Sequence, residues 1–187
     1  MPSEIWLVRH GETEWSRSGQ HTSRTDLPLT ADGELQAEGL KSMLAGRPFA
    51  LVLSSPMKRA VETCRAVGLT PEISDDLREW DYGDYEGLTT TQIQQRVPEW
   101  TIWTGAPPRG ETIQQVAART DRIIARALAA SGEVALFGHG HLLRVLGARW
   151  VGLEPSGGRL LALSTASLSV LGYERETRVI QLWNQTR

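Results

Sequence analysis

A histidine between an arginine and a glycine is the first feature of this chain that could do chemistry. Arg9, His10 and Gly11 directly follow residues 5–8 (Ile-Trp-Leu-Val), an apolar run typical of a buried strand. An arginine fork can hold two phosphate oxygens, a neutral imidazole is a nucleophile, and a glycine lets backbone N–H groups approach the oxygens. The tripeptide indicates a phosphoryl-transfer site at a strand end, although an exposed Arg-His pair in a loop fits these residues equally well.

Two later apolar runs also end in residues that suit anion binding. Residues 50–53 predict a strand. Ser55 and Pro56 then suit the cap and the first position of a helix, which would carry Arg59 in its first turn. Residues 133–137 predict another strand, which ends in a Gly-His-Gly turn. Because parallel strands end at one edge of a sheet, we expect all three ends to surround one anion-attracting crevice.

A carboxylate-rich loop supplies candidates for the proton transfer that phosphoryl transfer needs. Glu79 lies in segment 77–87, whose glycines and aromatic residues are atypical of a regular amphipathic helix. A nearby phosphate favours the protonated form of a carboxyl group, which suits a proton donor. Asp81, Asp84 and Glu86 compete with Glu79 for this role, and spacing alone does not choose among them.

Length, composition and charge limit the classes of protein to which the chain can belong. With 187 residues, 40% of them hydrophobic, the chain suits one globular domain over residues 1–187. A formal net charge of −2 without a Lys/Arg block argues against nucleic acid or anionic membranes as partners, so an anion site must be a local arginine cluster. The single cysteine, Cys64, excludes an internal disulfide. We expect no signal peptide and no membrane span, and therefore a cytoplasmic protein.

Strand and helix patterns alternate along the chain, which predicts an α/β fold. We expect a helix from Thr30 to Gly46 with an apolar face made of Leu35, Leu40, Met43 and Leu44. The longest helix is expected from residues 110–112 to about Ala130, and the next over 142–151. Late extended segments predict a hairpin of residues 167–173 and 178–183. The result is a three-layer α/β/α sandwich with a mostly parallel central sheet and an antiparallel edge strand.

Together the motifs resemble those of the histidine phosphatase superfamily, the phosphoglycerate mutase-like proteins. The resemblance rests on five segments, which are Arg9-His10-Gly11-Glu12-Thr13, Ser54-Ser55-Pro56 with Arg59, Leu77-Arg78-Glu79, Gly110-Glu111-Thr112 and Gly138-His139-Gly140. It is closest to small acid phosphatases and sedoheptulose-1,7-bisphosphatase-type members. It implies the family fold, no metal or other cofactor, and three groups of site residues: His10 as phosphorylated nucleophile, Glu79 as proton donor, and a phosphate pocket of Arg9, Arg59, His139 and Gly140.

The resemblance favours a phosphatase, a phosphoric monoester hydrolase acting on small phosphomonoesters such as sugar phosphates. It implies that a protonated His139 helps to hold the phosphate, and that the pH optimum is acid-leaning because Glu79 must start protonated. A cofactor-dependent phosphoglycerate mutase is the alternative, but mutases carry extra basic residues where segment 88–110 offers only Arg96 and Arg109. A catalytically silent phosphate-binding or interaction module is a third hypothesis, against which the intact site residues argue.

The mouth of the predicted pocket decides the substrate. The residues expected there are Ser16, Thr22, Ser23, Trp80 and Tyr82. Ser23 stands where a glycine is usual in the family and Ser16 where mutases have asparagine, so the substrate stays open. His21 is either a substrate contact or a polar loop residue. Four tryptophans either pack elsewhere or form an apolar wall of the pocket, namely Trp15, Trp80, Trp100 and Trp103.

Other polar and apolar groups are expected to have structural roles. His139 and His141 have the spacing of a metal pair, but no cysteine or nearby carboxylate completes a ligand set, and His141 is expected to be structural. Arg144 and Arg149 are expected to face solvent. The acidic residues of segment 81–86 are expected to cap backbone N–H groups. The apolar stretch 160–163 and the late hairpin could form a homodimer surface.

Overall fold

The first strand of the chain lies inside the sheet, between strands from its last third. In the computed structural model, which describes residues 4–186, the strands are β1 (Ile5–Arg9), β2 (Leu51–Ser54), β3 (Glu72–Ile73), β4 (Val134–Gly138), β5 (Leu168–Glu174) and β6 (Thr177–Gln185). Their order is β3-β2-β4-β1-β5-β6. The first four are parallel, and the β5-β6 hairpin joins β1 antiparallel. This confirms the predicted mostly parallel sheet with an antiparallel edge.

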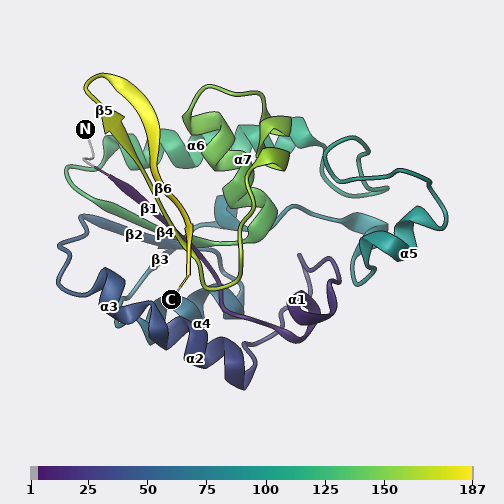
Figure 1. The fold of residues 1–187 in the computed structure, drawn as a ribbon, viewed down its shortest axis with the longest axis horizontal. Coiled ribbons are helices and arrows are strands. Elements are labelled where there is room, and N and C mark those ends of the chain that lie inside the picture. Colours follow the sequence, from purple (N-terminus) through teal and green to yellow (C-terminus); the bar gives the residue numbers. More distant parts are fainter. Residues whose placement is uncertain (1–3, 187) are drawn as a thin grey trace.

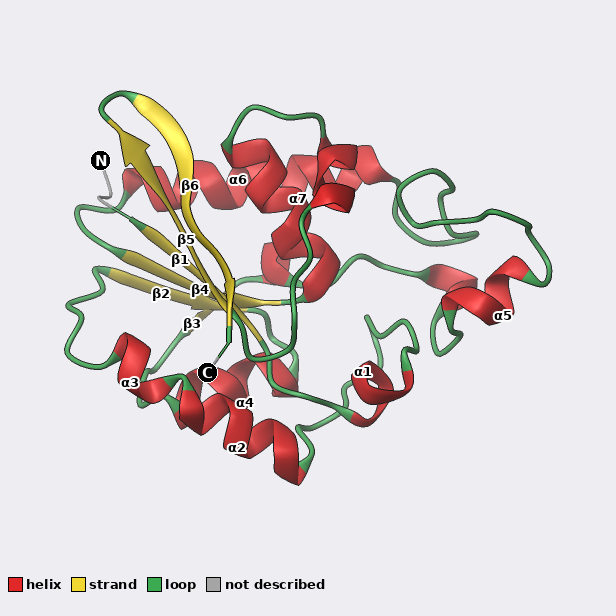
Figure 2. Cartoon of the chain, viewed as in Figure 1, coloured by secondary structure: helices red, strands yellow, loops and turns green. Residues whose placement is uncertain are grey.

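Helices cover both faces of the sheet (Figures 1 and 2). They are α1 (Glu14–Ser18), α2 (Ala31–Gly39), α3 (Lys41–Leu44), α4 (Lys58–Ala66), α5 (Thr90–Gln94), α6 (Ile113–Ala129) and α7 (Gly140–Trp150). Helices α6 and α7 lie on one face, and α2, α3 and α4 lie on the other. The segments around α1 and α5 extend beyond the carboxyl ends of the parallel strands. Among the described residues no helix has the length and apolar character needed to cross a membrane.

The side chains of the apolar β1 run pack into two hydrophobic clusters, one on each face of the sheet. Ile5 and Leu7 belong to the cluster under α6 and α7, whereas Trp6 and Val8 belong to the cluster under α2, α3 and α4. Successive side chains of a strand point to opposite faces, so a strand covered on both sides must be apolar at every position. This is why β1 reads as a continuous apolar run.

The helix predicted from Thr30 to Gly46 is broken in two. Thr30 caps α2, since its hydroxyl accepts the N–H of Gly33 at 3.0 Å, but α2 ends at Gly39 and α3 follows. Leu40 is buried, whereas Leu35 is 66% exposed, so its expected core position is wrong. Residues five apart lie about 140° apart around a helix, which explains why these two leucines do not share a face.

Two helix starts differ from the prediction by two residues. The helix after β2 begins at Lys58, with Met57 as its extended N-cap, and Pro56 precedes it. Helix α7 begins at Gly140, so Gly140 and His141 belong to its first turn rather than to a separate loop. The start of α6 is as expected, because Thr112 accepts the N–H of Gln115 in a capping box.

Candidate active site

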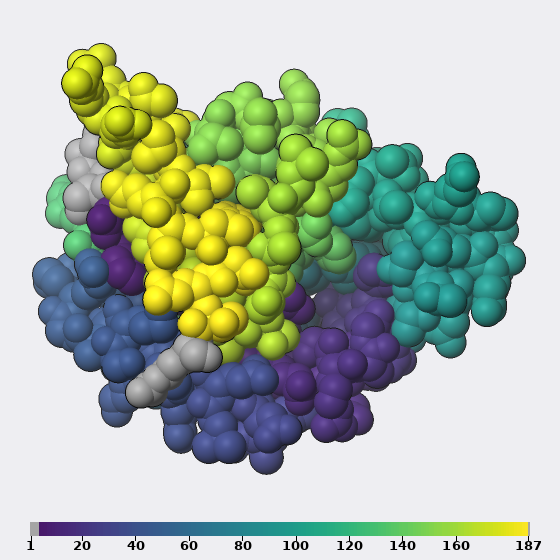
Figure 3. All heavy atoms as spheres, in the orientation of Figure 1, coloured from purple at the N-terminus to yellow at the C-terminus, as the bar shows by residue number. Residues whose placement is uncertain are grey.

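A pocket of about 270 Å³ opens where the parallel strands end. It is bounded by the segment around α1, the loop that carries Glu79, and the first turns of α7. Figure 3 shows the hollow between the purple, teal and yellow-green parts of the surface. Its titratable side chains are those of Arg9, His10, His21, Glu79, Tyr82, His141 and Arg144.

His10 is buried in this pocket and has a defined tautomer. Its Nδ1 lies 2.7 Å from the carbonyl oxygen of Gly11, and because a carbonyl can only accept, Nδ1 carries the proton. Nε2 therefore keeps its lone pair. Burial, followed by the charges of Arg59 and Arg9, holds the pKa of His10 well below its ordinary value. The ring is thus a neutral imidazole, the form that acts as a nucleophile.

The turn after His10 is fixed by close backbone packing. The N–H of Gly11 donates to Thr63 Oγ1 at 3.0 Å. A Cβ on Gly11 would overlap the carbonyl oxygen of Gly33 in α2, and a Cβ on Gly33 would overlap the carbonyl oxygen of Glu12. Both positions require glycine, because the two backbones approach too closely for any side chain.

Arg9 lines the pocket with one donor unused. Its Nη1 donates to the carbonyl oxygen of Leu163, while its buried Nε has no acceptor within residues 4–186. A Cβ on Gly140 would lie 3.3 Å from the central guanidinium carbon, so glycine there leaves room for the arginine. A buried donor without an acceptor costs about 1–3 kcal/mol. An anionic oxygen would satisfy it.

Arg59 and His139 lie behind His10 and do not line the pocket. The ring centres of His10 and His139 are 5.2 Å apart. Arg59 Nε donates to His139 Nδ1 at 3.2 Å, and its terminal nitrogens donate to the carbonyl oxygens of Thr22, Ser23 and Thr25. The charge of Arg59 therefore reaches the pocket from behind the two histidines.

The surroundings of His139 favour its neutral form over the expected protonated form. Its Nδ1 accepts from Arg59, so its proton lies on Nε2, 2.8 Å from Ser55 Oγ. Burial, and next the charge of Arg59, hold the pKa of His139 well below its ordinary value. A fully buried ring beside a permanent cation is stable only as the neutral form. Ser55, expected as the helix cap, precedes the actual N-cap Met57; its Oγ accepts this N–H and also the N–H of Met57 at 3.3 Å.

Glu79 is held by three backbone N–H groups. Oε1 accepts from Trp80 and Leu142, both at 2.9 Å, and Oε2 accepts from His141 at 3.0 Å. His141 and Leu142 belong to the first turn of α7, so the carboxylate sits at the positive end of that helix. Oε2 has fewer protein donors than Oε1, which leaves it the better placed to exchange a proton.

Arg119 is not among the expected site residues, yet it holds the loop that carries Glu79. Its guanidinium donates to both carboxylate oxygens of Glu111, at 2.8 and 2.7 Å. It also donates to the carbonyl oxygens of Asp76, Arg78 and Glu79. Glu111 of the Gly-Glu-Thr motif held a signal for it, because a carboxylate whose side chain is only 22% exposed favours a basic partner.

Three of the five expected mouth residues line the pocket, namely Ser16, Thr22 and Tyr82. Ser23 lies beside it, where its hydroxyl donates to the carbonyl oxygen of Glu79 at 3.3 Å and lines a neighbouring cleft. Trp80 is fully buried in the core, and its Nε1 donates to the carbonyl oxygen of Glu111 at 2.9 Å. The large apolar area of the indole favours that core position over the polar pocket.

Aromatic rings back the mouth of the pocket. His21 lines it, with its ring centre 4.6 Å from that of Tyr82 and 5.7 Å from that of Trp100. Trp103 packs on His141, 5.4 Å between centres. None of the four tryptophans considered above lines the pocket itself, so they support its wall rather than form it. Burial lowers the pKa of His21 to about 4, so this ring is neutral too.

The two histidines after β4 have separate partners. His139 contacts Arg59 and Ser55, whereas His141 Nδ1 lies 2.6 Å from the hydroxyl of Tyr82. Within residues 4–186 no group of three or more His, Cys, Asp or Glu side chains is placed to hold a metal ion.

The two arginines of α7 have different surroundings. Arg144 lines the pocket, so the expectation that it faces solvent is wrong. Arg149 forms an ion pair with Asp121 of α6 at 3.0 Å. Spacing on one helix does not reveal which side meets the pocket, because that depends on the segments packed around it.

The acidic residues after Glu79 mostly cap backbone groups, as expected. Glu86 accepts the N–H groups of Ser23 and Thr25, at 2.8 and 3.0 Å. Asp81 Oδ1 accepts the N–H of Gly83 at 3.0 Å. The exception is Asp84, whose carboxylate accepts from Arg109 Nε at 2.6 Å.

Comparison with known families decides where this site belongs. The model of the histidine phosphatase superfamily (branch 1) matches residues 5–186, which include every site residue described above. The chain belongs to the histidine phosphatase superfamily. It is 41% identical to an acid phosphatase of Mycobacterium tuberculosis over 188 residues, 97% of this chain and 92% of that protein. It is 37% identical to a sedoheptulose 1,7-bisphosphatase of Saccharomyces cerevisiae over 182 residues, 79% of this chain and 67% of that protein.

Solved structures share the fold of this histidine phosphatase superfamily member. The structure of an open reading frame product of Mycobacterium tuberculosis matches with a TM-score of 0.95 and 38% identity, covering 100% of this chain and 99% of that one. A mycobacterial glucosyl-3-phosphoglycerate phosphatase, solved as a complex with VO3, matches with a TM-score of 0.88 and 28% identity, covering 98% and 100%.

Proposed function

We propose that this chain hydrolyses small phosphomonoesters through a phosphohistidine on His10, without a metal ion. The observation that carries the proposal is the hydrogen bond from His10 Nδ1 to the carbonyl oxygen of Gly11. It leaves Nε2 free to attack in a pocket lined by Arg9, whose unused donor suits a phosphate oxygen. A cavity of about 270 Å³ favours a small substrate.

The first step forms the phosphohistidine. His10 Nε2 attacks phosphorus, the ester P–O bond breaks, and Glu79 gives a proton to the departing oxygen. Arg9 stabilises the charge on the equatorial oxygens, and Arg59 adds its charge from behind the histidines.

The second step releases phosphate. Glu79, now a carboxylate, takes a proton from water as the water oxygen attacks phosphorus. The N–P bond breaks, inorganic phosphate leaves, and His10 returns to its neutral form. His139 takes part as a neutral N–H donor, because its surroundings exclude the imidazolium.

Hydrolysis of p-nitrophenyl phosphate tests the proposal. We expect His10→Ala to lower kcat by about 10³-fold or more, and EDTA to have no effect. A rapid alkaline quench followed by mass spectrometry should find a phosphoryl adduct on His10. Arg149→Gln, at a residue that does not line the pocket, is the matched control and should keep wild-type rates. Activity that survives His10→Ala, or that EDTA abolishes, would contradict the mechanism.

The mutase alternative is an outcome of the same assays. Of the two arginines in segment 88–110, Arg109 is paired with Asp84 and Arg96 does not line the pocket. We therefore expect phosphate release from 3-phosphoglycerate to exceed its isomerisation in the presence of 2,3-bisphosphoglycerate. Faster isomerisation would favour the mutase.

A further inference from the structure

The carbonyl group that fixes the tautomer of His10 belongs to a peptide group that α2 holds from its other side. The carbonyl oxygen of Gly11 and the N–H of Glu12 are the two polar atoms of this one peptide group. The oxygen lies 2.7 Å from His10 Nδ1, and the N–H donates to Gln36 Oε1 at 3.0 Å. A trans peptide group is planar, so its N–H and C=O point in opposite directions and the direction of one determines that of the other.

Gln36 reaches this peptide group because α2 packs closely on the turn after His10. Gly33 and Gln36 lie three residues apart, on the same side of α2. Since Gly33 has no side chain, its backbone can approach that of Glu12. A backbone N–H can only donate, so the amide of Gln36 must turn its oxygen toward Glu12. The side chain of Gln36 is therefore an acceptor that α2 supplies to the turn.

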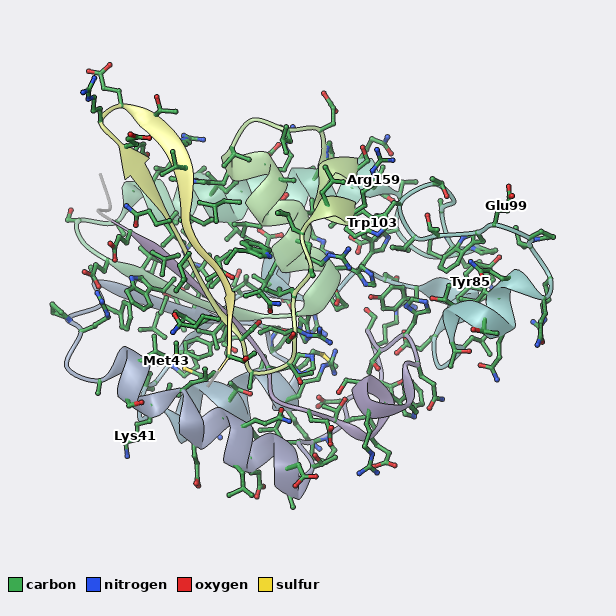
Figure 4. All side chains as sticks on the ribbon, in the orientation of Figure 1. Lys41, Met43, Tyr85, Glu99, Trp103 and Arg159 are labelled. Atoms are coloured by element: carbon green, nitrogen blue, oxygen red, sulfur yellow. The ribbon has the colours of Figure 1, made fainter. Side chains whose placement is uncertain are left out.

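Helix α2 is fastened to this turn at further points and stays outside the pocket. Its N-cap Thr30 donates its N–H to the carbonyl oxygen of Glu12 at 3.0 Å and its hydroxyl to Glu12 Oε1 at 2.9 Å. Figure 4 shows Met43 of α3, the helix that follows α2, pointing toward the sheet and Lys41 pointing away from it. Gln36 lines a separate surface groove and not the catalytic pocket. A substrate in the pocket therefore does not meet Gln36.

The orientation of this peptide group controls which nitrogen of His10 is free to react. Glycine restricts the backbone less than any other residue, so the peptide group after Gly11 needs contacts that hold its orientation. If it rotated, its oxygen would leave His10 Nδ1, and the ring proton would be free to move to Nε2. A protonated Nε2 has no lone pair with which to attack phosphorus. Consecutive hydrogen bonds also polarise one another, so the bond to Gln36 makes the Gly11 oxygen a better acceptor.

We infer that Gln36 is a positioning residue for His10, which it keeps in the tautomer protonated on Nδ1 by orienting the peptide group between Gly11 and Glu12. Its effect on the reaction rate rests on the proposed function of the pocket. The tautomer itself is a property of the protein without substrate. The alternative is that Gln36 only ties α2 to the loop and contributes to stability alone.

A matched contact elsewhere in the chain allows the two roles to be separated. Glu62 of α4 accepts the N–H of Leu29 at 3.0 Å through its Oε2, and it does not line the pocket. Gln36→Met and Glu62→Met each remove one acceptor for a loop N–H and keep the length of the side chain. Gln36→Glu is the conservative variant, because it keeps an acceptor at the same position.

Nitrogen NMR of the imidazole rings, recorded without substrate, measures the tautomer. The signals that are absent from His10→Ala belong to His10. We expect a protonated Nδ1 in the wild type, in Gln36→Glu and in Glu62→Met. In Gln36→Met the Nδ1 signal should shift toward that of an unprotonated nitrogen and the Nε2 signal should shift the opposite way.

Single-turnover release of p-nitrophenol from p-nitrophenyl phosphate, with the protein in excess, measures the attack of His10. We expect Gln36→Met to slow it by about tenfold, the factor that corresponds to one net hydrogen bond. The steady-state KM should change by less than about threefold, because Gln36 does not meet the substrate. Gln36→Glu should recover most of the rate, and Glu62→Met should keep the wild-type rate.

The possible failures are distinguishable. A wild-type tautomer in Gln36→Met, or the same loss of tautomer and rate in Gln36→Glu as in Gln36→Met, would overturn the role of Gln36 and leave the phosphatase intact. If the wild type does not hydrolyse p-nitrophenyl phosphate, or if His10→Ala does, the proposed function fails, and the NMR spectra still test the tautomer. If Gln36→Met does not fold, Gln36→Ala, a favourable change in a helix, replaces it in both measurements.

Discussion

Arg119 and Glu111 form a two-bond ion pair that fixes the position of Glu79. The pair is partly buried, with side-chain exposures of 13% and 22%. Arg119 reaches from α6 to the carbonyl oxygens of the loop, including that of Glu79. Glu79 is the proton donor of the proposed mechanism. Arg119 of α6 holds its backbone carbonyl, and two N–H groups of α7 hold its carboxylate.

Removing this pair should cost both stability and activity. We expect Arg119→Ala to lower the free energy of unfolding by about 2–4 kcal/mol, because Glu111 and three carbonyl groups lose their donor. In p-nitrophenyl phosphate assays kcat should fall about tenfold or more with a smaller change in KM, since Glu79 moves. Arg126→Ala removes an exposed ion pair between α6 and Glu72 of β3 and should change stability by less than about 1 kcal/mol. Equal effects in both variants would contradict the positioning role.

The contact between Gly11 and Gly33 predicts an effect on catalysis from outside the pocket. A methyl group on Gly33 must push away the backbone of Glu12, two residues from His10, the proposed nucleophile. We expect Gly33→Ala to lower stability by about 1–3 kcal/mol and kcat by up to about 10²-fold, as a displacement near 1 Å would. Urea unfolding and steady-state kinetics measure these losses. Glu34→Ala, an exposed change in the same turn, should leave both near wild type.

Stability should depend on the histidines between about pH 6.5 and about pH 4. Burial is the main cause of the lowered pKa of His10, His21, His139 and His141. A folded His21 has a pKa of about 4 against an ordinary value of 6.5, so between these values the unfolded chain binds more protons. The free energy of unfolding therefore falls as pH falls, by up to about 1.4 kcal/mol per pH unit for each neutral histidine.

Urea unfolding at about pH 7 and about pH 5 measures this slope. His21→Gln removes one titrating ring. It should reduce the slope of the free energy of unfolding against pH by up to the contribution of one proton, about 1.4 kcal/mol per pH unit. A free energy of unfolding that rises as pH falls, or a slope that is the same in His21→Gln and wild type, would contradict this prediction.

The Tyr82 hydroxyl should contribute to stability through His141. Their atoms lie 2.6 Å apart, and Tyr82→Phe would leave His141 Nδ1 without this partner in a buried setting. We expect a loss of about 1–2 kcal/mol in urea unfolding and a change in the imidazole nitrogen shifts of His141 by NMR. Tyr85→Phe keeps its ring contact with Trp100 and serves as the control, with an effect below about 0.5 kcal/mol. Similar losses of stability in both variants would contradict this role of the Tyr82 hydroxyl.

The parts of the fold that depend on local signals were predictable. Thr30 and Thr112 start their helices because a hydroxyl accepts an N–H three residues on, which the sequence displays directly. The meeting of Arg9 with the later strand ends was predictable because parallel strands expose their carboxyl ends at one edge. Pro56 misled the prediction, since proline suits both the first turn of a helix and the loop before it.

The parts that depend on distant segments were not predictable from spacing. Trp80 and Glu79 are neighbours in sequence, yet one enters the core and the other the pocket. Arg144 and Arg149 share a helix, and only the contacts of residues 158–159 and Trp103 turn Arg144 toward the cavity. Burial and the nearby charge of Arg59 lower the pKa of His139, and these surroundings come from residues far apart in the sequence.

The pairing of β1 has a consequence for how the chain folds. Ile5 pairs with Val134 on one side and with Leu171 on the other, so the strand that leads into His10, the proposed nucleophile, has no sheet partner until the last third of the chain has been made. Such long-range pairing is slow, because the whole intervening loop must close first. During synthesis the apolar residues 5–8 therefore need protection from aggregation, and the catalytic turn is among the last parts to reach its final geometry.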